Sequence, residues 1–136
     1  MANLIYGKAK QSLLNGEINV SSQSLKVLLV DSTYTLSQST HQFVSDISSS
    51  SIKARSTALL NVQNTLGVLD ADDLTIVDYP GNAFQSVILY VDTGLDATSR
   101  LIAHIDTATG IPFAGINTVL NITIAWSNDS TKIISL

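Results

Sequence analysis

Residues 84–106 read FQSVILYVDTGLDATSRLIAHID and contain two apolar runs separated by a polar turn. The five-residue core at 87–91 is too short and too rich in β-branched residues for a buried helix, so it predicts a central strand covered on both faces. Residues 92–98 turn the chain. Residues 99–106 then alternate, with Leu101, Ala103 and Ile105 expected inward and Arg100 and His104 outward. The two segments together predict a β-hairpin at the centre of the fold.

Most of the remaining sequence also predicts strands. Residues 25–30, LKVLLV, are typical of a buried strand, and residues 52–62 of an edge strand whose Lys53 and Arg55 face water. The other expected strands are two short pieces about an acidic turn within 66–79, a cleanly alternating segment at 119–126, and a last strand at 131–136. We expect the C-terminal half to be a meander, in which neighbouring segments pair.

The apolar residues near the N-terminus have the spacing of a helix and not the alternation of a strand. Residues 4–14 place Ile5, Ala9 and Leu13 at i, i+4 and i+8, the spacing of a helix with one apolar stripe. Asn3 can cap its start, and Asn15-Gly16 is a usual helix stop. A single short helical turn, capped by a hydroxyl at its start, is expected at 40–47.

These patterns predict a mainly β protein, a single antiparallel β-sandwich or small barrel of about seven or eight strands with one N-terminal α-helix. The expected organisation is one domain overall, with the helix at 1–16 and the β-sandwich at 17–136, and one domain is also what 136 residues favour. The apolar stripe of the helix must be buried. It packs either across an open end of its own sheet or on a neighbouring copy or partner, and the sequence leaves both open.

Composition limits the classes of function. The chain has no cysteine, which excludes disulfides and thiolate sites. Seven Lys+Arg against 11 Asp+Glu give a net charge of −4, which disfavours binding to nucleic acid. No apolar run is long enough for a membrane span and no export signal is recognised, so we expect a soluble protein with no membrane partner. With charged residues at 13%, Ser and Thr must cover the surface, which favours life in a stable assembly.

Residues that could carry chemistry are few. No local signature singles out a serine nucleophile for either histidine, His41 or His104. Asp70, Asp72 and Asp73 could offer oxygens to a hard cation, but their loop lacks the calcium-loop pattern, so a solvated turn is favoured over weak metal binding. We therefore expect no catalytic residue, no metal, no cofactor and no enzyme activity.

Five stretches of the chain carry a resemblance to a known family: NLIYGKAKQSLLNGEIN, KVLLVDSTYTLSQSTHQFVSDI, DADDLT, VILYVDTGLDATSRLIAHIDTATGIP and ITIAWSNDSTKIISL. In this order they resemble small virion structural proteins of tailed bacteriophages. The resemblance implies a capsid decoration (cement) protein, or failing that a tail-associated component. Such cement proteins are commonly β-rich and multimeric, often trimeric. They bind the outer surface of the capsid at junctions between capsomers, so the implied partners are the major capsid protein and further copies of the chain. No catalytic residue belongs to the pattern.

The residues of the chain and its resemblance to virion proteins both favour function by adhesion. The expected contact positions are apolar or aromatic. They are Leu4, Ile5 and Tyr6 of the helix, Tyr34 and Phe43 of the loop region, and the loop that contains Ile111 and Phe113. Each of them has a core position as its alternative. Two other functions stay open: a host-glycan-binding module of the tail, and a wall hydrolase that would depend on His104.

Overall fold

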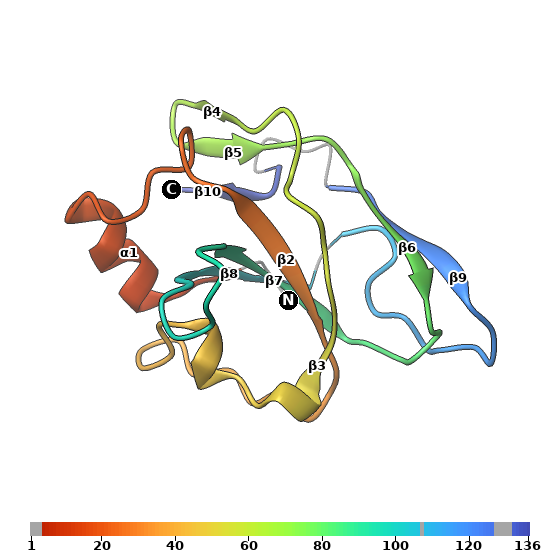
Figure 1. Ribbon diagram of the computed structural model, residues 1–136. Coiled ribbons are helices and arrows are strands. Elements are labelled where there is room, and N and C mark those ends of the chain that lie inside the picture. Colours follow the sequence, from red (N-terminus) through yellow and green to blue (C-terminus); the bar gives the residue numbers. More distant parts are fainter. Residues whose placement is uncertain (1–3, 107, 127–131) are drawn as a thin grey trace.

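The central element of the fold is a five-stranded antiparallel sheet (Figure 1). The computed structural model describes residues 4–106, 108–126 and 132–136. In the order β1-β8-β7-β2-β3, the strands are Leu4–Ile5, Leu101–Ile105, Ser86–Val91, Leu25–Val30 and Ile52–Arg55. β7 and β8 form the hairpin expected from residues 84–106, and every residue of β7 is buried, as expected of a central strand. The buried strand expected at 25–30 is β2, paired with β7 along its whole length.

The alternation expected in β8 is wrong in part. The register shifts by one residue between the pairs Leu89–Ala103 and Tyr90–Leu101. This bulge inserts one extra residue into β8, so that Leu101, Ile102 and Ala103 are all buried. His104, expected to face water, is half-buried.

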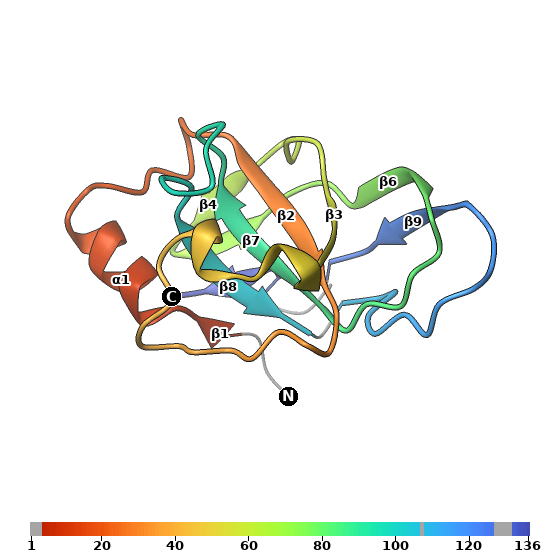
Figure 2. The same ribbon diagram turned by 60° about the horizontal axis from the view of Figure 1, so that its bottom comes forward.

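The remaining strands form two smaller antiparallel sheets. One has the order β10-β5-β4, with strands Ile134–Ser135, Val68–Asp70 and Gln63–Thr65, and the other pairs β6 with β9, at Leu74–Tyr79 and Leu120–Ile124. β6 and β9 lie at the end of the molecule opposite to the helix in both views of the ribbon (Figures 1 and 2).

The expected meander of the C-terminal half is therefore wrong, because β9 and β10 do not extend the β7–β8 hairpin. The outer edge of β8 already pairs with β1, and the outer edge of β7 pairs with β2. β9 instead pairs with β6, whose buried Leu74 and Ile76 alternate with the same period, and β10 pairs with β5. The two extended pieces expected about an acidic turn are confirmed as β5 and β6.

The N-terminal helix is shorter than expected. Helix α1 spans Gly7–Leu14, whereas Leu4 and Ile5 form β1 and pair with His104 and Ala103 of β8. The Tyr6 N–H extends this pairing by donating to the Ile102 carbonyl at 3.1 Å. At Leu4 and Ile5, pairing with the open edge of β8 satisfies backbone N–H and C=O groups. These residues are therefore extended although their side chains have helical spacing. The stop is as expected, since Gly16 has φ +75°. The expected cap, Asn3, lies outside the described residues.

Two further local expectations are corrected. The helical turn expected at 40–47 is a 3₁₀ helix, η1, at Val44–Asp46, and a second one, η2, follows at Ser49–Ser51. The carboxylate of Asp46 accepts hydrogen bonds from the N–H groups of Gln42 and Phe43, so a carboxylate from within the turn holds its start. The strand expected over 52–62 is an edge strand, but it stops at Arg55. Its charged side chains form ion pairs, Lys53 with Asp31 and Arg55 with Asp96.

The fold class expected from the sequence is confirmed: the protein is mainly β and antiparallel with one α-helix. The strands described here number ten, more than expected, because four of the paired segments are only two or three residues long. Within the described ranges the sheets do not close into a barrel. The buried apolar side chains of all three sheets and of α1 form one contiguous core. None of the described helices is long and apolar enough to cross a membrane.

Candidate functional site

Three leucines are exposed at the end of the molecule that carries α1. Leu14 ends the helix, Leu66 lies at the tip of the β4–β5 hairpin, and Leu136 follows β10, with exposed fractions of 89%, 98% and 70%. Between the helix and the hairpin lies an apolar cavity of about 50 Å³, which Leu136 also lines. Its other apolar lining residues are Leu13, Val20, Leu69, Ile102 and Ile134. We call the three exposed leucines and this cavity the leucine patch.

Leu66 stands in a backbone conformation that leucine disfavours. It forms with Gly67 the two-residue loop between the paired residues Thr65 and Val68, at φ +52° and +82°. Such loops favour Asn-Gly, because both positions have positive φ. A leucine at positive φ costs about 1–2 kcal/mol, and at 98% exposure Leu66 gains almost no burial within its own chain. A residue that disfavours its own backbone conformation and gains no burial within the fold is expected at functional positions.

A second exposed apolar surface lies at the opposite end, on the two-stranded sheet. We call β6, β9 and the loops at their tip the β6–β9 arm. Its inward residues are buried, among them Ile76 and Ile122, while Val77, Ile116 and Val119 are exposed. The rings of Tyr79, Phe84 and Phe113 pack together with centroids 5.5–6.3 Å apart and join the arm to the end of β7.

The contact positions expected from the sequence serve mainly the packing of the chain itself. Tyr6 is fully buried and is not on the helix, and it therefore offers no surface to a partner. The other six, all half-buried, are Leu4 and Ile5 in β1, Tyr34, Phe43, Ile111 and Phe113. Phe43 lies under the guanidinium of Arg100, 5.2 Å from the ring centroid. None of the seven belongs to the leucine patch. One local signal in the sequence could have pointed to that patch, namely a leucine directly before the glycine of a turn.

Tyr34 takes part in a chain of side-chain hydrogen bonds. Its hydroxyl lies 2.8 Å from the hydroxyl of Tyr6 and 2.8 Å from Nδ1 of His41. Burial, and secondly the bond to Tyr34, raise the pKa of Tyr6 well above its usual range, so that Tyr6 stays neutral. Two hydrogen bonds thus join Tyr6, Tyr34 and His41 through the Tyr34 hydroxyl, which can both donate and accept.

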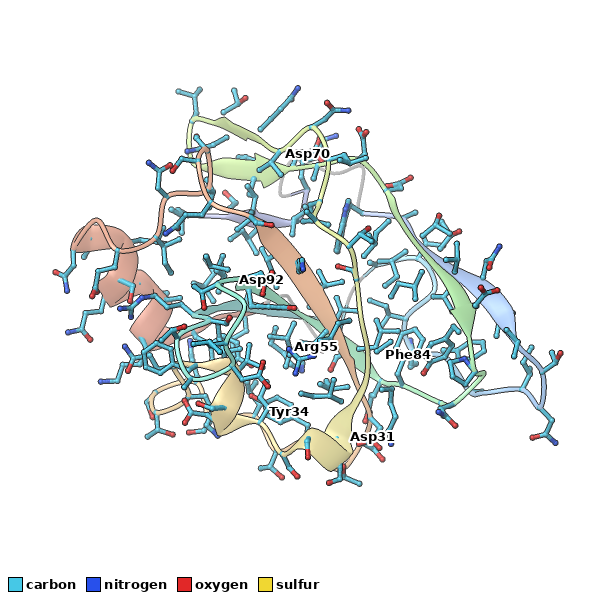
Figure 3. The ribbon with its side chains drawn as sticks, in the orientation of Figure 1. Asp31, Tyr34, Arg55, Asp70, Phe84 and Asp92 are labelled. Carbon is cyan, nitrogen blue, oxygen red and sulfur yellow. The ribbon has the colours of Figure 1, made fainter. Side chains whose placement is uncertain are left out.

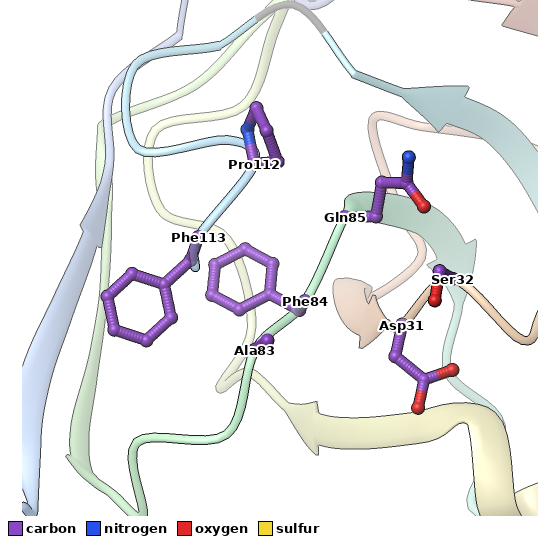
Figure 4. Close-up of a pocket in the computed structure, with 7 residues that line it drawn as sticks. All are labelled: Asp31, Ser32, Ala83, Phe84, Gln85, Pro112 and Phe113. Atoms are coloured by element: carbon purple, nitrogen blue, oxygen red, sulfur yellow. The ribbon is translucent and has the colours of Figure 1, made fainter. Parts of the chain in front are cut away.

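A polar groove lies beside this chain of hydroxyl groups. One cavity, of about 270 Å³, is bounded by Asp31, Tyr34, Gln85, Ser86, His104, Asp106 and Pro112. It shares three of these residues with a neighbouring cavity of about 290 Å³ that extends to Phe84 and Phe113 (Figure 4). The groove brings His104 and Asp106 together, which the sequence could not show. Among the described residues, however, no hydrogen bond joins a serine or threonine hydroxyl to a histidine, as a hydrolytic triad requires.

We predict that His104 makes the stability of the protein depend on pH near neutrality. Its Nδ1 is inaccessible to solvent and, in the described part of the chain, has no hydrogen-bond partner. Burial lowers the pKa of His104, an effect that the charge of Asp106 partly opposes. The unfolded chain therefore binds a proton at a higher pH than the folded chain. The contribution of His104 is complete above about pH 6.5 and is lost as the pH falls toward its folded pKa.

Urea unfolding at about pH 7.5 and about pH 5.5 measures this effect, with His104→Gln as the non-titrating variant. When the pH is lowered from about 7.5 to about 5.5, the free energy of unfolding should decrease more in the wild type than in the His104→Gln variant. Asp31, Asp46, Asp92 and Asp96 do not confuse the result, because their lowered pKa values place their effect below about pH 3.8. Equal slopes for the two proteins would refute the prediction.

The three aspartates considered as metal ligands each accept a hydrogen bond from within the chain. Asp70 accepts from the N–H of Ala71, Asp72 from the Asn61 side chain, and Asp73 from the N–H of Trp126. Over the described ranges no group of three or more potential ligands is placed to hold a metal ion. These bonds agree with the interpretation of the segment as a turn.

Comparison with known proteins identifies no relative of this chain. No protein-family model matches the chain, and no curated protein matches it. The features that bear on function are therefore the two apolar surfaces, the polar groove and the resemblance carried by the sequence.

Proposed function

We propose that this chain is a structural protein of a tailed-phage virion, most specifically a capsid decoration (cement) protein that stabilises the icosahedral shell by bridging capsomers. Its partners in this proposal are the major capsid protein and further copies of itself, trimers being favoured, on the outer surface of the capsid. It is not an enzyme in this proposal. The observation that carries the proposal is Leu66, an almost fully exposed leucine held at positive φ beside an apolar cavity.

The mechanism is thermodynamic linkage. A protein that binds the assembled shell but not its dissociated subunits lowers the free energy of the assembled state. Many identical contacts of modest strength add up over a lattice, because each bound copy links neighbouring subunits. A small rigid fold with an exposed leucine patch suits this role, since burial of apolar surface needs no chemistry at the contact.

The test is co-sedimentation of the purified chain with empty, expanded capsids of its phage. The wild type should sediment with the shells and raise their melting temperature. Leu66→Asn should weaken binding by about tenfold or more, because a fully buried leucine side chain contributes about 1.5–3 kcal/mol. Its own fold should be as stable as the wild type or more stable, since asparagine suits positive φ.

The matched control is Leu95→Asn, which replaces an exposed leucine outside the leucine patch. This variant should bind shells like the wild type. Failure of the wild type to bind any shell would refute the cement role, and equal binding by the Leu66 and Leu95 variants would refute the role of the leucine patch.

The polar groove favours a second candidate, a tail-associated module that binds host glycans. Gln85, Ser86 and Asp106 offer hydrogen-bonding groups beside Phe113 and Pro112, a mixed polar and apolar lining of the kind found in ligand sites. Binding of the purified chain to a glycan array, lost in Gln85→Ala, would support this candidate over the cement role.

A further inference from the structure

The polar groove has an apolar wall and a polar wall. In Figure 4, Phe84, Phe113 and Pro112 lie on one side of the cavity and Asp31 lies on the other. In Figure 3, Asp31 lies between Tyr34 and Phe84, each of which lines one of the two cavities. A ligand in the groove would therefore contact phenyl and proline rings with one face and hydrogen-bonding groups with its other side.

The fold fixes both walls while their surfaces stay accessible. Gln85 and Pro112 are exposed, and Phe113 is half-buried. Phe84 and Phe113 exchange two backbone hydrogen bonds, of 3.1 and 2.8 Å, and their rings pack with centroids 5.5 Å apart. The Gln85 N–H donates to the carbonyl of Val30 at 2.8 Å. Because these groups are already in place, a ligand would order little of the chain when it binds.

The lining of the groove carries acid and no base. Asp31 and Asp106 contribute carboxylates, whereas no lysine or arginine is among the described residues that line the two cavities. Burial lowers the pKa of His104, so this side chain is neutral at neutral pH. Lys53 pairs with Asp31 at 3.2 Å but lines neither cavity. An anionic ligand would therefore meet carboxylates and no positive charge, which is unfavourable.

This combination suits an uncharged saccharide. A sugar ring has a face of C–H groups, which can pack on aromatic and proline rings, and hydroxyl groups that donate to carboxylates and bond to amides. An acidic sugar adds a carboxylate, sulfate or phosphate, for which proteins use arginine or lysine. The two adjoining cavities, of about 290 and 270 Å³, are close to the lower end of the range for small-molecule sites, about 300–1,000 Å³.

We propose that the polar groove binds an uncharged oligosaccharide and discriminates against sugars that carry a negative charge. A sugar ring packs on Phe113 and Pro112, and its hydroxyl groups bond to Gln85, Asp31 and Asp106. The inference names the ligand class of the second candidate function, the glycan-binding module, and rests on that candidate. Phe113, a contact position expected from the sequence, would thus contact a ligand.

The test is binding of the full chain to an array of matched oligosaccharides. Each pair consists of a neutral oligosaccharide and the same oligosaccharide with an added sialic acid or sulfate, such as lactose and sialyllactose. The wild type should bind at least one neutral member and bind its acidic partner about tenfold or more weakly. Titration calorimetry with that pair in solution then gives the two dissociation constants.

Gln85→Lys tests whether the lining of the groove causes the discrimination. It adds a base to the groove at an exposed position, so the acidic member of the pair should bind at least about tenfold more tightly than it binds the wild type. The matched control is Gln63→Lys, at an exposed position of β4 that lines neither cavity. It changes the net charge equally and should discriminate like the wild type. Circular dichroism establishes that each variant folds.

Acidic members bound by the wild type as tightly as their neutral partners would overturn the inference and leave the glycan-binding candidate standing. So would a Gln85→Lys variant that discriminates like the wild type, or a Gln63→Lys control that loses discrimination equally. Absence of binding to every member of the array would overturn both the inference and the glycan-binding candidate. The cement role is tested separately by binding to shells and does not depend on any of these results.

Discussion

Replacement of Gly81 by alanine is expected to lower the free energy of unfolding by about 3 kcal/mol or more, with the loss centred on the β6–β9 arm. Gly81 has φ +96°, a conformation that side-chain-bearing residues rarely adopt. A Cβ atom there would lie 2.3 Å from the Ile116 carbonyl oxygen and 2.6 Å from that of Thr118. Backbone strain and a clash with two backbone atoms each cost about 1–3 kcal/mol. Neither backbone atom can move aside as a flexible side chain would.

This close approach explains how the arm is built. The Ile116 N–H donates to the Gly81 carbonyl at 2.9 Å, so the turn after β6 and the loop before β9 are held together at this point. The exposed Val77 lies in β6 and the exposed Val119 lies directly before β9.

The matched control is Gly94→Ala in the turn between β7 and β8. Gly94 has a similar φ of +89°, but a Cβ atom there would meet nothing within 4 Å. Only the conformational cost remains, about 1 kcal/mol. Urea unfolding of the two variants separates the clash from the positive φ. Equal losses for Gly81→Ala and Gly94→Ala would contradict the prediction.

The parts of the fold that could be predicted from the sequence are those decided by local pattern. Residues 87–91 are a central strand and residues 25–30 a buried one because their apolar runs suit a strand covered on both faces. The helix stops at Gly16 because a positive φ is required there. Each of these features depends on residues within one short stretch of the chain.

The errors come from pairings between distant segments. Residues 4 and 5 have helical spacing, yet they form β1 because the edge of β8, about a hundred residues later, was open to them. β9 pairs with β6 rather than with β8, because β1 already occupies the outer edge of β8. Periodicity indicates which residues are buried but does not indicate which edge a strand joins.

The candidate site was harder to predict than the fold. An apolar residue in a sequence can lie in the core or at a contact, and the sequence predicts Tyr6, Phe43 and Phe113 at contacts, with a core position as the alternative for each. The exposed Leu14 and Val77 lie in elements that also contain buried residues, so exposure depends on the arrangement of elements in space. Leu66 is the exception, because its place before Gly67 in a hairpin loop is visible in the sequence.

Whether an apolar residue lies in the core or at a contact matters most for stability at Tyr6. We expect the second large loss of unfolding free energy when this residue is replaced. Tyr6→Ala should cost about 3–5 kcal/mol, because it removes a fully buried aromatic ring from the core. The ring lies where β1 becomes α1, beside the backbone bonds from Tyr6 N–H to Ile102 and from Gly7 N–H to Gln38. Loss of the ring should therefore release both the helix and the segment around residue 38.

Tyr6→Phe separates the ring from its hydroxyl. This variant keeps the packing but removes the hydrogen bond to Tyr34, which should cost about 1 kcal/mol. Urea unfolding gives the two free energies, and amide exchange in α1 shows whether the helix opens before the rest of the fold. If Tyr6 were instead a contact residue, Tyr6→Ala would leave the isolated chain as stable as the wild type and would affect only its association. A loss of several kcal/mol in the dilute, monomeric chain, largely avoided by phenylalanine, is the result that assigns Tyr6 to the core and leaves adhesion to the leucine patch and the arm.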